Sequence, residues 1–179
     1  MKTLVLKNVC SHTFLATMKT MAEESPNWDF RWPKNTPNIE DRFPKLRLIN
    51  NDPVPENAVL AGMAISLFAL MNDVAPGEDN LADYDIVGCQ ISIKDRNRVD
   101  NFHTDYEDDD IIKVIGILDG FWDVKTMGGD FSHDNKLYPM NPGTFIVFDP
   151  RILHAAKEIT TDRKRFAIDY ALRRIDDGT

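Results

Sequence analysis

The pattern of apolar and polar residues changes from helix-like to strand-like at about residue 85. In the first part, Ser11 is a favourable N-cap, and the helix that follows it carries one apolar stripe and ends at Ser25-Pro26. The stripe consists of Phe14, Leu15, Met18 and Met21. A second helix is predicted over about residues 56–72, where apolar residues surround most of the circumference, as expected for a helix packed against a sheet.

Short runs with the alternation of strands follow residue 85, and turns containing glycine or proline separate several of them. These runs are Ile86–Ile93, Ile111–Leu118, Thr144–Phe148, Ile152–Ala156 and Phe166–Leu172. Residues 1–6 begin like a signal peptide, but Lys7 and Asn8 end the apolar run early, so one further strand is predicted there. Helices followed by many short strands predict a mainly β fold, a double-stranded β-helix or cupin-like jelly-roll barrel supported by N-terminal helices. We expect one domain over residues 1–179, with helical support and a loop in 1–84 and the jelly-roll core in 85–174.

A long irregular segment is predicted between the two helices, at residues 27–55. It is rich in proline and carries the aromatic residues Trp28, Phe30 and Trp32. Loops of this length are uncommon in compact domains and often act as lids or binding loops. An ordered connection whose aromatic residues cover the edge of the core is the favoured interpretation, and a lid is the alternative.

Charge and cysteine content limit the classes of partner. The net charge is −8 and the sequence pI is about 4.9, which disfavours binding to duplex nucleic acid and favours small-molecule or protein substrates. Cys10 and Cys89 are too few for a disulfide framework or a zinc knuckle, and they suit a reducing cytoplasm. The apolar stretch 57–71 is interpreted as a buried helix that is too short to span a membrane. We therefore expect a cytoplasmic protein without membrane association.

Four residues in the strand-rich part form a pattern with chemical meaning: His103, Asp105, His154 and Arg165. His103 and Asp105 are two positions apart, so on a regular extended strand their side chains would point to the same side. Two imidazoles and one carboxylate are the ligands of the facial triad that holds non-heme Fe(II) and leaves coordination positions open. An arginine one strand beyond the second histidine can bind a dicarboxylate through two parallel hydrogen bonds.

With these residues the chain resembles the Fe(II)/2-oxoglutarate-dependent dioxygenases, in particular the prolyl-hydroxylase-like branch of that superfamily. Residues 102–105 (FHTD) resemble its H-x-D motif, and residues 128–131 (GGDF) resemble its G-G-[DE]-[FL] turn. The run 142–148 (PGTFIVF) followed by 153–155 (LHA) is similar to the strand, turn and distal histidine. Residues 165–167 (RFA) are similar to R-x-[ST]. The elements occur in the expected order and at fitting separations.

The resemblance implies the ligands and the reaction. Iron would be held by His103, Asp105 and His154, and Arg165 would bind the far carboxylate of an iron-chelating 2-oxoglutarate. Ala167 stands where many members have a hydroxyl residue, which removes one hydrogen bond to the co-substrate, and Arg163 is an alternative partner for that carboxylate. Dioxygen would be consumed and 2-oxoglutarate converted to succinate, with ascorbate as an optional further cofactor. Because an aspartate completes the triad, hydroxylation, or demethylation through hydroxylation, is favoured over halogenation.

Other polar residues receive less specific interpretations. The acidic run at residues 107–110 is read as a solvated turn, and the alternative is that it borders the active-site mouth and favours a cationic or neutral substrate. His12 and His133 are interpreted as surface or capping residues. Four aromatic residues are candidates for lining the pocket or binding the co-substrate: Tyr84, Trp122, Tyr138 and Tyr170.

The leading hypothesis is a 2-oxoglutarate-dependent hydroxylase whose substrate is unidentified. Peptidyl proline leads, with an amino acid or other small molecule close behind, and nucleobase oxidation or demethylation is disfavoured by the net charge. A cupin-like metal-binding protein that does not use 2-oxoglutarate is the alternative, and in it Arg165 would be a structural ion-pair partner. A catalytically silent interaction domain is a third class, which the intact triad disfavours because buried polar groups without a metal lower stability. The sequence leaves the oligomeric state undetermined.

Overall fold

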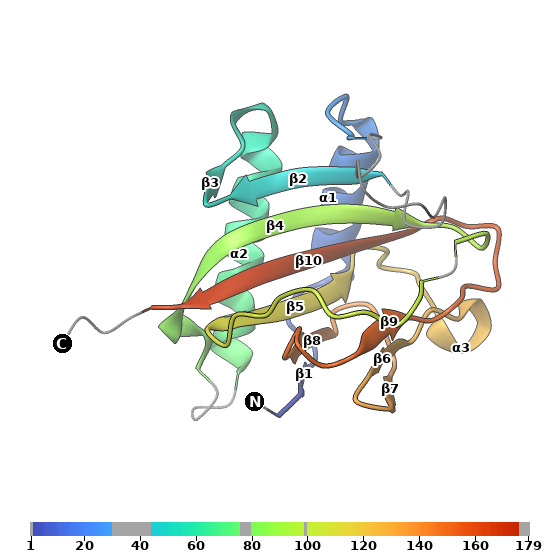
Figure 1. Cartoon of the computed structure of the whole chain (residues 1–179). Helices are drawn as coiled ribbons and strands as arrows, with labels where there is room; N and C mark the ends of the chain where they lie inside the picture. The colour runs from blue at the N-terminus through green and yellow to red at the C-terminus, as the bar shows by residue number, and fades with distance from the viewer. Residues whose placement is uncertain (1, 30–43, 76–79, 99, 176–179) are drawn as a thin grey trace.

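The strands form two antiparallel sheets, with two helices behind the larger sheet (Figure 1). The computed structural model describes residues 2–29, 44–75, 80–98 and 100–175. The seven-stranded sheet has the order β1-β8-β5-β10-β4-β2-β3, and the three-stranded sheet has the order β7-β6-β9. The strands of the larger sheet are β1 (Leu4–Leu6), β2 (Lys45–Asn50), β3 (Asp52–Pro53), β4 (Tyr84–Lys94), β5 (Ile111–Ile117), β8 (Phe145–Phe148) and β10 (Arg165–Arg174). Those of the smaller sheet are β6 (Phe131–His133), β7 (Lys136–Tyr138) and β9 (His154–Ala156).

The first helix forms as its sequence indicates. Helix α1 (His12–Glu24) begins after Ser11, whose hydroxyl accepts a hydrogen bond from the amide of Phe14, and it ends at Ser25. Such a cap satisfies one of the amide groups that a helix start leaves without a partner. The predicted stripe faces the sheet through Leu15 and Met18, which are completely buried.

The second helix has about the predicted length and lies two residues later than its pattern predicts. Helix α2 (Ala58–Val74) follows a 3-10 turn (Pro55–Asn57), and together they are long and apolar enough to cross a membrane by length and composition alone. A core helix passes the same test, and α2 packs on the sheet through Leu60, Ala64 and Leu67. The hydroxyl of Tyr170 on β10 donates a hydrogen bond to the carbonyl of Ala64. The described contacts thus place α2 in the core.

Strand alternation divides the interior into two cores. On β8, Phe145 and Val147 join the core beneath the helices, whereas Ile146 and Phe148 join a second core with the three-stranded sheet. Because successive side chains point to opposite faces, a strand covered on both sides has an uninterrupted apolar sequence. The buried run Phe-Ile-Val-Phe therefore reflects the position of β8 between two layers.

The last strand, β10, has core residues on one face and residues that line a cavity on the other. Its residues Phe166, Ile168, Tyr170 and Leu172 are buried beneath the helices. The alternate positions Arg165, Ala167 and Asp169 face away from the helices and line one cavity, as their shared parity predicts. Helices α1 and α2 thus support a sheet whose opposite face carries the candidate site.

The strand pairs of the described residues form two antiparallel sheets, so the fold is mainly β as predicted, and a closed barrel is not shown among these residues. The structure corrects two other expectations about the fold. The expected boundary between residues 84 and 85 is misplaced, because β1, β2 and β3 belong to the larger sheet. The segment 27–55 is not irregular throughout, since β2 pairs with β4 along its length. Of its aromatic residues, Trp28 packs edge-on against Phe166, whereas Phe30 and Trp32 lie outside the described residues, so the lid remains a prediction.

Candidate metal centre

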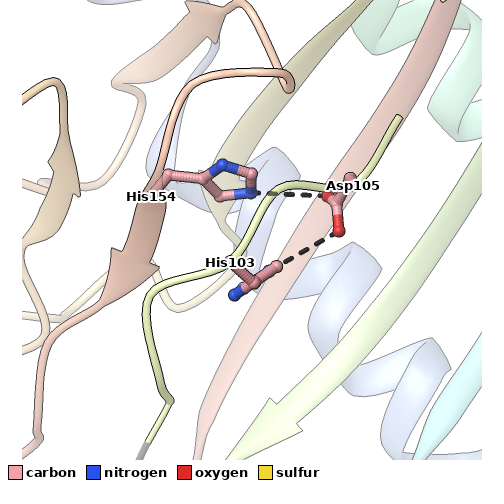
Figure 2. Close-up of side chains that lie close together, drawn as sticks. All are labelled: His103, Asp105 and His154. Carbon is pink, nitrogen blue, oxygen red and sulfur yellow. Dashed lines mark ion pairs between the residues drawn. The ribbon is translucent and has the colours of Figure 1, made fainter. Parts of the chain in front are cut away.

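His103, Asp105 and His154 converge in space, as the sequence predicts (Figure 2). One ligand atom of each lies within 4.8 Å of the others. The Nε2 atoms of His103 and His154 are 3.5 and 3.4 Å from the two carboxylate oxygens of Asp105. His154 is buried, whereas the other two side chains remain partly exposed. The three donors therefore form a site that opens to solvent on one side.

Main-chain carbonyls fix the orientation of both imidazole rings. Nδ1 of His103 is 2.8 Å from the carbonyl of Asn101, and Nδ1 of His154 is 2.9 Å from the carbonyl of Ile152. Because a carbonyl can only accept a hydrogen bond, Nδ1–H is the donor in each ring, and Nε2 is the ring atom left to bind a metal ion. Such an outer hydrogen bond orients metal-binding histidines and makes them more basic. The donor set fits a divalent transition metal.

The two halves of the triad are joined by main-chain hydrogen bonds. His103 and His154 form an antiparallel bridge in which each amide donates to the other's carbonyl, at 3.1 and 3.0 Å. The amide of Asp105 donates to the carbonyl of Pro150. His103 and Asp105 therefore do lie on one side of their segment, although this segment is not the regular strand that the sequence predicts.

Arg165 lines the same cavity as the triad and has no ion-pair partner among the described residues. It is 3 % exposed, and Nη1 donates a short hydrogen bond to the carbonyl of Gly129. Its Nε is buried without a hydrogen-bond partner, and no carboxylate of the described residues forms an ion pair with it. Burial lowers the pKa of Arg165 to about 10. A buried guanidinium with an unpaired donor is costly unless an anion completes it, so the residue fits a carboxylate ligand.

The structure separates the other two predicted co-substrate residues. Ala167 lines the cavity beside Arg165, and its small side chain leaves space there. Arg163 does not line this cavity and forms an ion pair with Asp119, with 2.8 Å between Nη2 and the carboxylate. The alternative assignment of the co-substrate carboxylate to Arg163 is therefore corrected, because its guanidinium already has a carboxylate partner elsewhere.

The metal-centre cavity has a volume of about 120 Å³ and contains charged residues beyond the triad. Lys94 is buried beside Arg165 and pairs with Asp100, at 2.7 Å, and its ammonium also donates to the carbonyl of Ala156. Arg98 contacts the same carboxylate. Both cations thus have the carboxylate of Asp100 as a partner.

Lys113 is the functional residue that the sequence analysis missed. Its ammonium lies 2.6 Å from Asp105 and 3.4 Å from Asp169, and the side chain is largely buried on β5. Burial alone would lower the pKa of Lys113, but the carboxylates of Asp169 and Asp105 raise it above its usual range. Burial alone would raise the pKa of Asp105, but the neighbouring His154 ring and Lys113 ammonium hold it well below its usual range. Lys113 therefore favours the ionised form of Asp105 and helps to fix its carboxylate beside the two imidazoles.

The remaining sequence predictions have mixed outcomes. His133 is buried rather than on the surface, and its ring contacts the hydroxyl of Thr3 and the carbonyl of Asp149. In the acidic run, Asp108 and Asp110 pair with Arg173, and none of its carboxylates lines the metal-centre cavity. The candidate aromatic residues Tyr84, Trp122, Tyr138 and Tyr170 do not line that cavity either.

Replacing Gly129 by alanine should weaken the arginine site. The residue has φ +88°, and an added Cβ would lie 2.7 Å from Nη1 of Arg165. We expect a loss of about 1–3 kcal/mol in the free energy of unfolding together with weaker 2-oxoglutarate binding, measured by denaturation and calorimetry. Gly62→Ala is the matched control, because nothing lies within 4 Å of its added Cβ and alanine is favoured by about 1 kcal/mol inside a helix. Equal effects of the two substitutions would contradict the close approach.

Replacing Lys113 by methionine should destabilise the metal-free protein more than the metal-bound protein. Without Lys113, Asp105 and Asp169 lose their cation, and breaking a buried pair in this way typically costs about 3–5 kcal/mol. Zn²⁺ should restore part of this loss, because the ion supplies positive charge to Asp105. Denaturation with chelator and with Zn²⁺ measures the difference, and the surface pair Lys19–Glu23 provides the control Lys19→Met. The same loss in both states would argue against the coupling.

Comparison with solved structures shows which proteins have a similar fold. No family model and no curated protein matches the sequence. The solved structure of a Pseudomonas putida prolyl-4-hydroxylase is similar, with a TM-score of 0.67 and 14% identity over 96% of this chain and 92% of that chain. The chain has the fold of the 2-oxoglutarate-Fe(II) oxygenases. This finding confirms the fold that the motifs imply.

Two further structures show the range of proteins that share this fold. A Trichoplax adhaerens prolyl hydroxylase, in complex with a peptide fragment of the hypoxia inducible factor oxygen degradation domain, has a TM-score of 0.62 and 15% identity over 96% and 83% of the two chains. HygX from Streptomyces hygroscopicus, with nickel and 2-oxoglutarate bound, has a TM-score of 0.63 and 11% identity over 97% and 83%. Prolyl hydroxylases and other oxygenases are thus both among the structural neighbours.

Proposed function

We propose that the protein is an Fe(II)- and 2-oxoglutarate-dependent dioxygenase that hydroxylates its substrate. The observation that carries this proposal is the buried guanidinium of Arg165, which has an unpaired Nε in the same cavity as the His-Asp-His cluster. A set of three metal-binding side chains would by itself suit many enzymes. When a buried cation without an ion-pair partner among the described residues lies beside it, the pair suits a co-substrate with a metal-binding end and a carboxylate end, as in 2-oxoglutarate.

Different residues of the site would bind the metal and the co-substrate. His103, Asp105 and His154 would hold the iron, and Arg165 would bind and orient the distal carboxylate of 2-oxoglutarate. With dioxygen, the loaded centre supplies an oxidant strong enough for an unactivated C–H bond. One oxygen atom enters the substrate as a hydroxyl group, and the other enters succinate as 2-oxoglutarate loses carbon dioxide. Lys113 keeps Asp105 ionised, and the buried walls around Arg165 exclude water from the carboxylate.

The cupin-like alternative is less well supported. It requires Arg165 to be a structural ion-pair partner, whereas no carboxylate among the described residues pairs with it. A jelly-roll scaffold, a single domain and a cytoplasmic location belong to the proposal. The cysteines Cys10 and Cys89 are both free, which suits a reducing compartment. Ascorbate is proposed only as a reductant that maintains Fe(II).

Succinate formation tests the proposed function. Protein reconstituted with Fe(II) under anaerobic conditions should release succinate when 2-oxoglutarate, ascorbate and air are added, slowly even without a substrate. Glutarate, which lacks the keto oxygen needed for chelation, should give no turnover and should compete with 2-oxoglutarate. A protein that binds neither Fe(II) nor 2-oxoglutarate would rule the proposal out.

A further inference from the structure

A second, larger cavity lies beside the metal centre on the same face of the seven-stranded sheet. Its volume is about 350 Å³, near the lower end of the roughly 300–1,000 Å³ typical of small-molecule sites. It shares Asp105, Lys113 and Asp169 with the metal-centre cavity. We call it the β2 groove, because its outer wall includes Lys45 and Arg47 of that strand. A ligand in the β2 groove can therefore extend to the metal centre.

Arg47 lines this groove, is exposed, and has no ion-pair partner among the residues that the structure describes. The register aligns Arg47 with Gln90 on β4, and Gln90 with Asp169 on β10. Both carboxylate oxygens of Asp169 are already engaged, one by Gln90 at 3.0 Å and the other by Lys113 at 3.4 Å. The main-chain carbonyl of Arg47 accepts a hydrogen bond from Asn57, but its guanidinium makes none and forms no ion pair with the residues that the structure describes.

The groove is positive although the chain as a whole is acidic. Among its described lining residues are three cations, Lys45, Arg47 and Lys113, and two carboxylates, Asp105 and Asp169. One of these carboxylates is a proposed iron ligand, so a bound metal would add further positive charge. Lys45 is half-buried, and this burial lowers the pKa of its ammonium. An excess of positive charge in a chain of net charge −8 favours an anionic ligand here.

We propose that the β2 groove binds the substrate, a small molecule whose carboxylate or phosphate group is held by Arg47 while the carbon to be oxidised lies at the metal centre. Neighbouring strands are about 4.8 Å apart, so β2 and β10 are separated by about 10 Å. This span suits a molecule of the size of an amino acid or a dipeptide. Tyr106, which lines the groove and is 39% exposed, offers a ring against which such a molecule can pack.

The inference rests on the proposed function and narrows it. A peptidyl proline within a chain has no charge of its own, so it would bring no anion to Arg47. A free acid or a phosphorylated metabolite would complete the guanidinium with two parallel hydrogen bonds. The proposal therefore favours the small-molecule substrate over the peptide substrate.

Matched acids and amides test the proposal. Fe(II)-loaded protein with 2-oxoglutarate would be assayed for stimulated succinate formation by amino acids and dipeptides, each as the free acid and as the C-terminal amide. Phosphoserine is compared with serine to test a phosphate group. A proline peptide with both ends blocked tests a substrate without charge, and a metabolite extract tests further acids. We expect stimulation by an acid or a phosphate at least tenfold above its neutral partner. The arm that responds identifies the anion.

Variants of Arg47 then test whether this residue binds the anionic group of the substrate. Arg47→Gln should raise the KM for the stimulating acid at least tenfold, and Arg47→Lys should retain most of the affinity. Arg173→Gln is the matched control, because Arg173 is an exposed arginine that pairs with Asp110 and does not line the groove. The proposal is overturned by an unchanged KM in Arg47→Gln, by equal stimulation with the blocked peptide, or by the absence of any stimulating anion. Affinity for Fe(II) and 2-oxoglutarate in the unmodified protein tests the proposed function separately.

Discussion

Replacing His103 and Asp105 together by alanine is expected to abolish Fe(II) binding and succinate formation. The two substitutions remove two of the three donor atoms that lie within 4.8 Å of one another, and His154 alone cannot hold the ion. Loss of an outer hydrogen-bond partner already weakens metal binding by about 10–100-fold. Loss of two ligands should exceed that range, which makes this the largest effect predicted for the protein.

Co²⁺ absorption and succinate release measure this prediction. The double variant His12→Ala with Asp52→Ala is a matched control, since it removes one histidine and one aspartate that are both exposed. It should bind Co²⁺ like the unmodified protein. Circular dichroism shows whether the ligand variant, His103→Ala with Asp105→Ala, is folded. Metal-dependent succinate release that persists in the folded ligand variant would falsify the assignment of the triad.

Replacing Arg165 by glutamine is expected to raise the Kd for 2-oxoglutarate about 30-fold or more. Truncating one partner of a buried, hydrogen-bonded charge pair costs about 2–5 kcal/mol, and 1.4 kcal/mol corresponds to a factor of ten. Calorimetry with Mn²⁺ in place of Fe²⁺ measures the affinity without turnover. Metal affinity should change little, since Arg165 is not a ligand. Arg163→Gln is the control, and it should leave the Kd unchanged while lowering stability through loss of its pair with Asp119.

Thermal stability provides a second test of Arg165. In the absence of 2-oxoglutarate its charge is buried without an ion-pair partner among the described residues, and burial lowers its pKa to about 10. Arg165→Met should therefore be at least as stable as the unmodified protein when no co-substrate is present. The rise in melting temperature on addition of 2-oxoglutarate should disappear, because stabilisation by a ligand depends on its affinity. A variant that unfolds at a much lower temperature would indicate a structural role instead.

The elements of the fold that depend on local sequence patterns were predictable. Ser11 marks the start of α1, and the alternation of β10 separates Phe166 and Ile168 from Arg165 and Ala167. β2 was missed because prolines surround it and because its residues gain their strand conformation from pairing with β4. Propensity and composition cannot report such a pairing, since strand preference depends on the neighbouring strands.

The metal ligands were predictable and their support was not. His103, Asp105 and His154 are residue types with few alternative roles in combination, and their spacing is visible in the chain. Lys113 is one lysine in an apolar strand, so its sequence context does not distinguish it from a surface residue. Its role follows from the register of β5 with β10, which places its ammonium between Asp105 and Asp169. His133 was misjudged for the same reason, since only packing shows that it is buried.

The sequence by itself determined the chemistry of the site: two imidazoles, one carboxylate and an arginine on an alternating strand. Only the tertiary structure decided between Arg165 and Arg163, because the two are separated by their partners, a main-chain carbonyl of Gly129 in one case and Asp119 in the other. It also decided that Arg47, from a strand distant in sequence, faces the groove beside the metal centre. The physical reason is that ligand types are properties of single residues, whereas burial, pairing and unpaired charge arise from contacts between segments far apart in the chain.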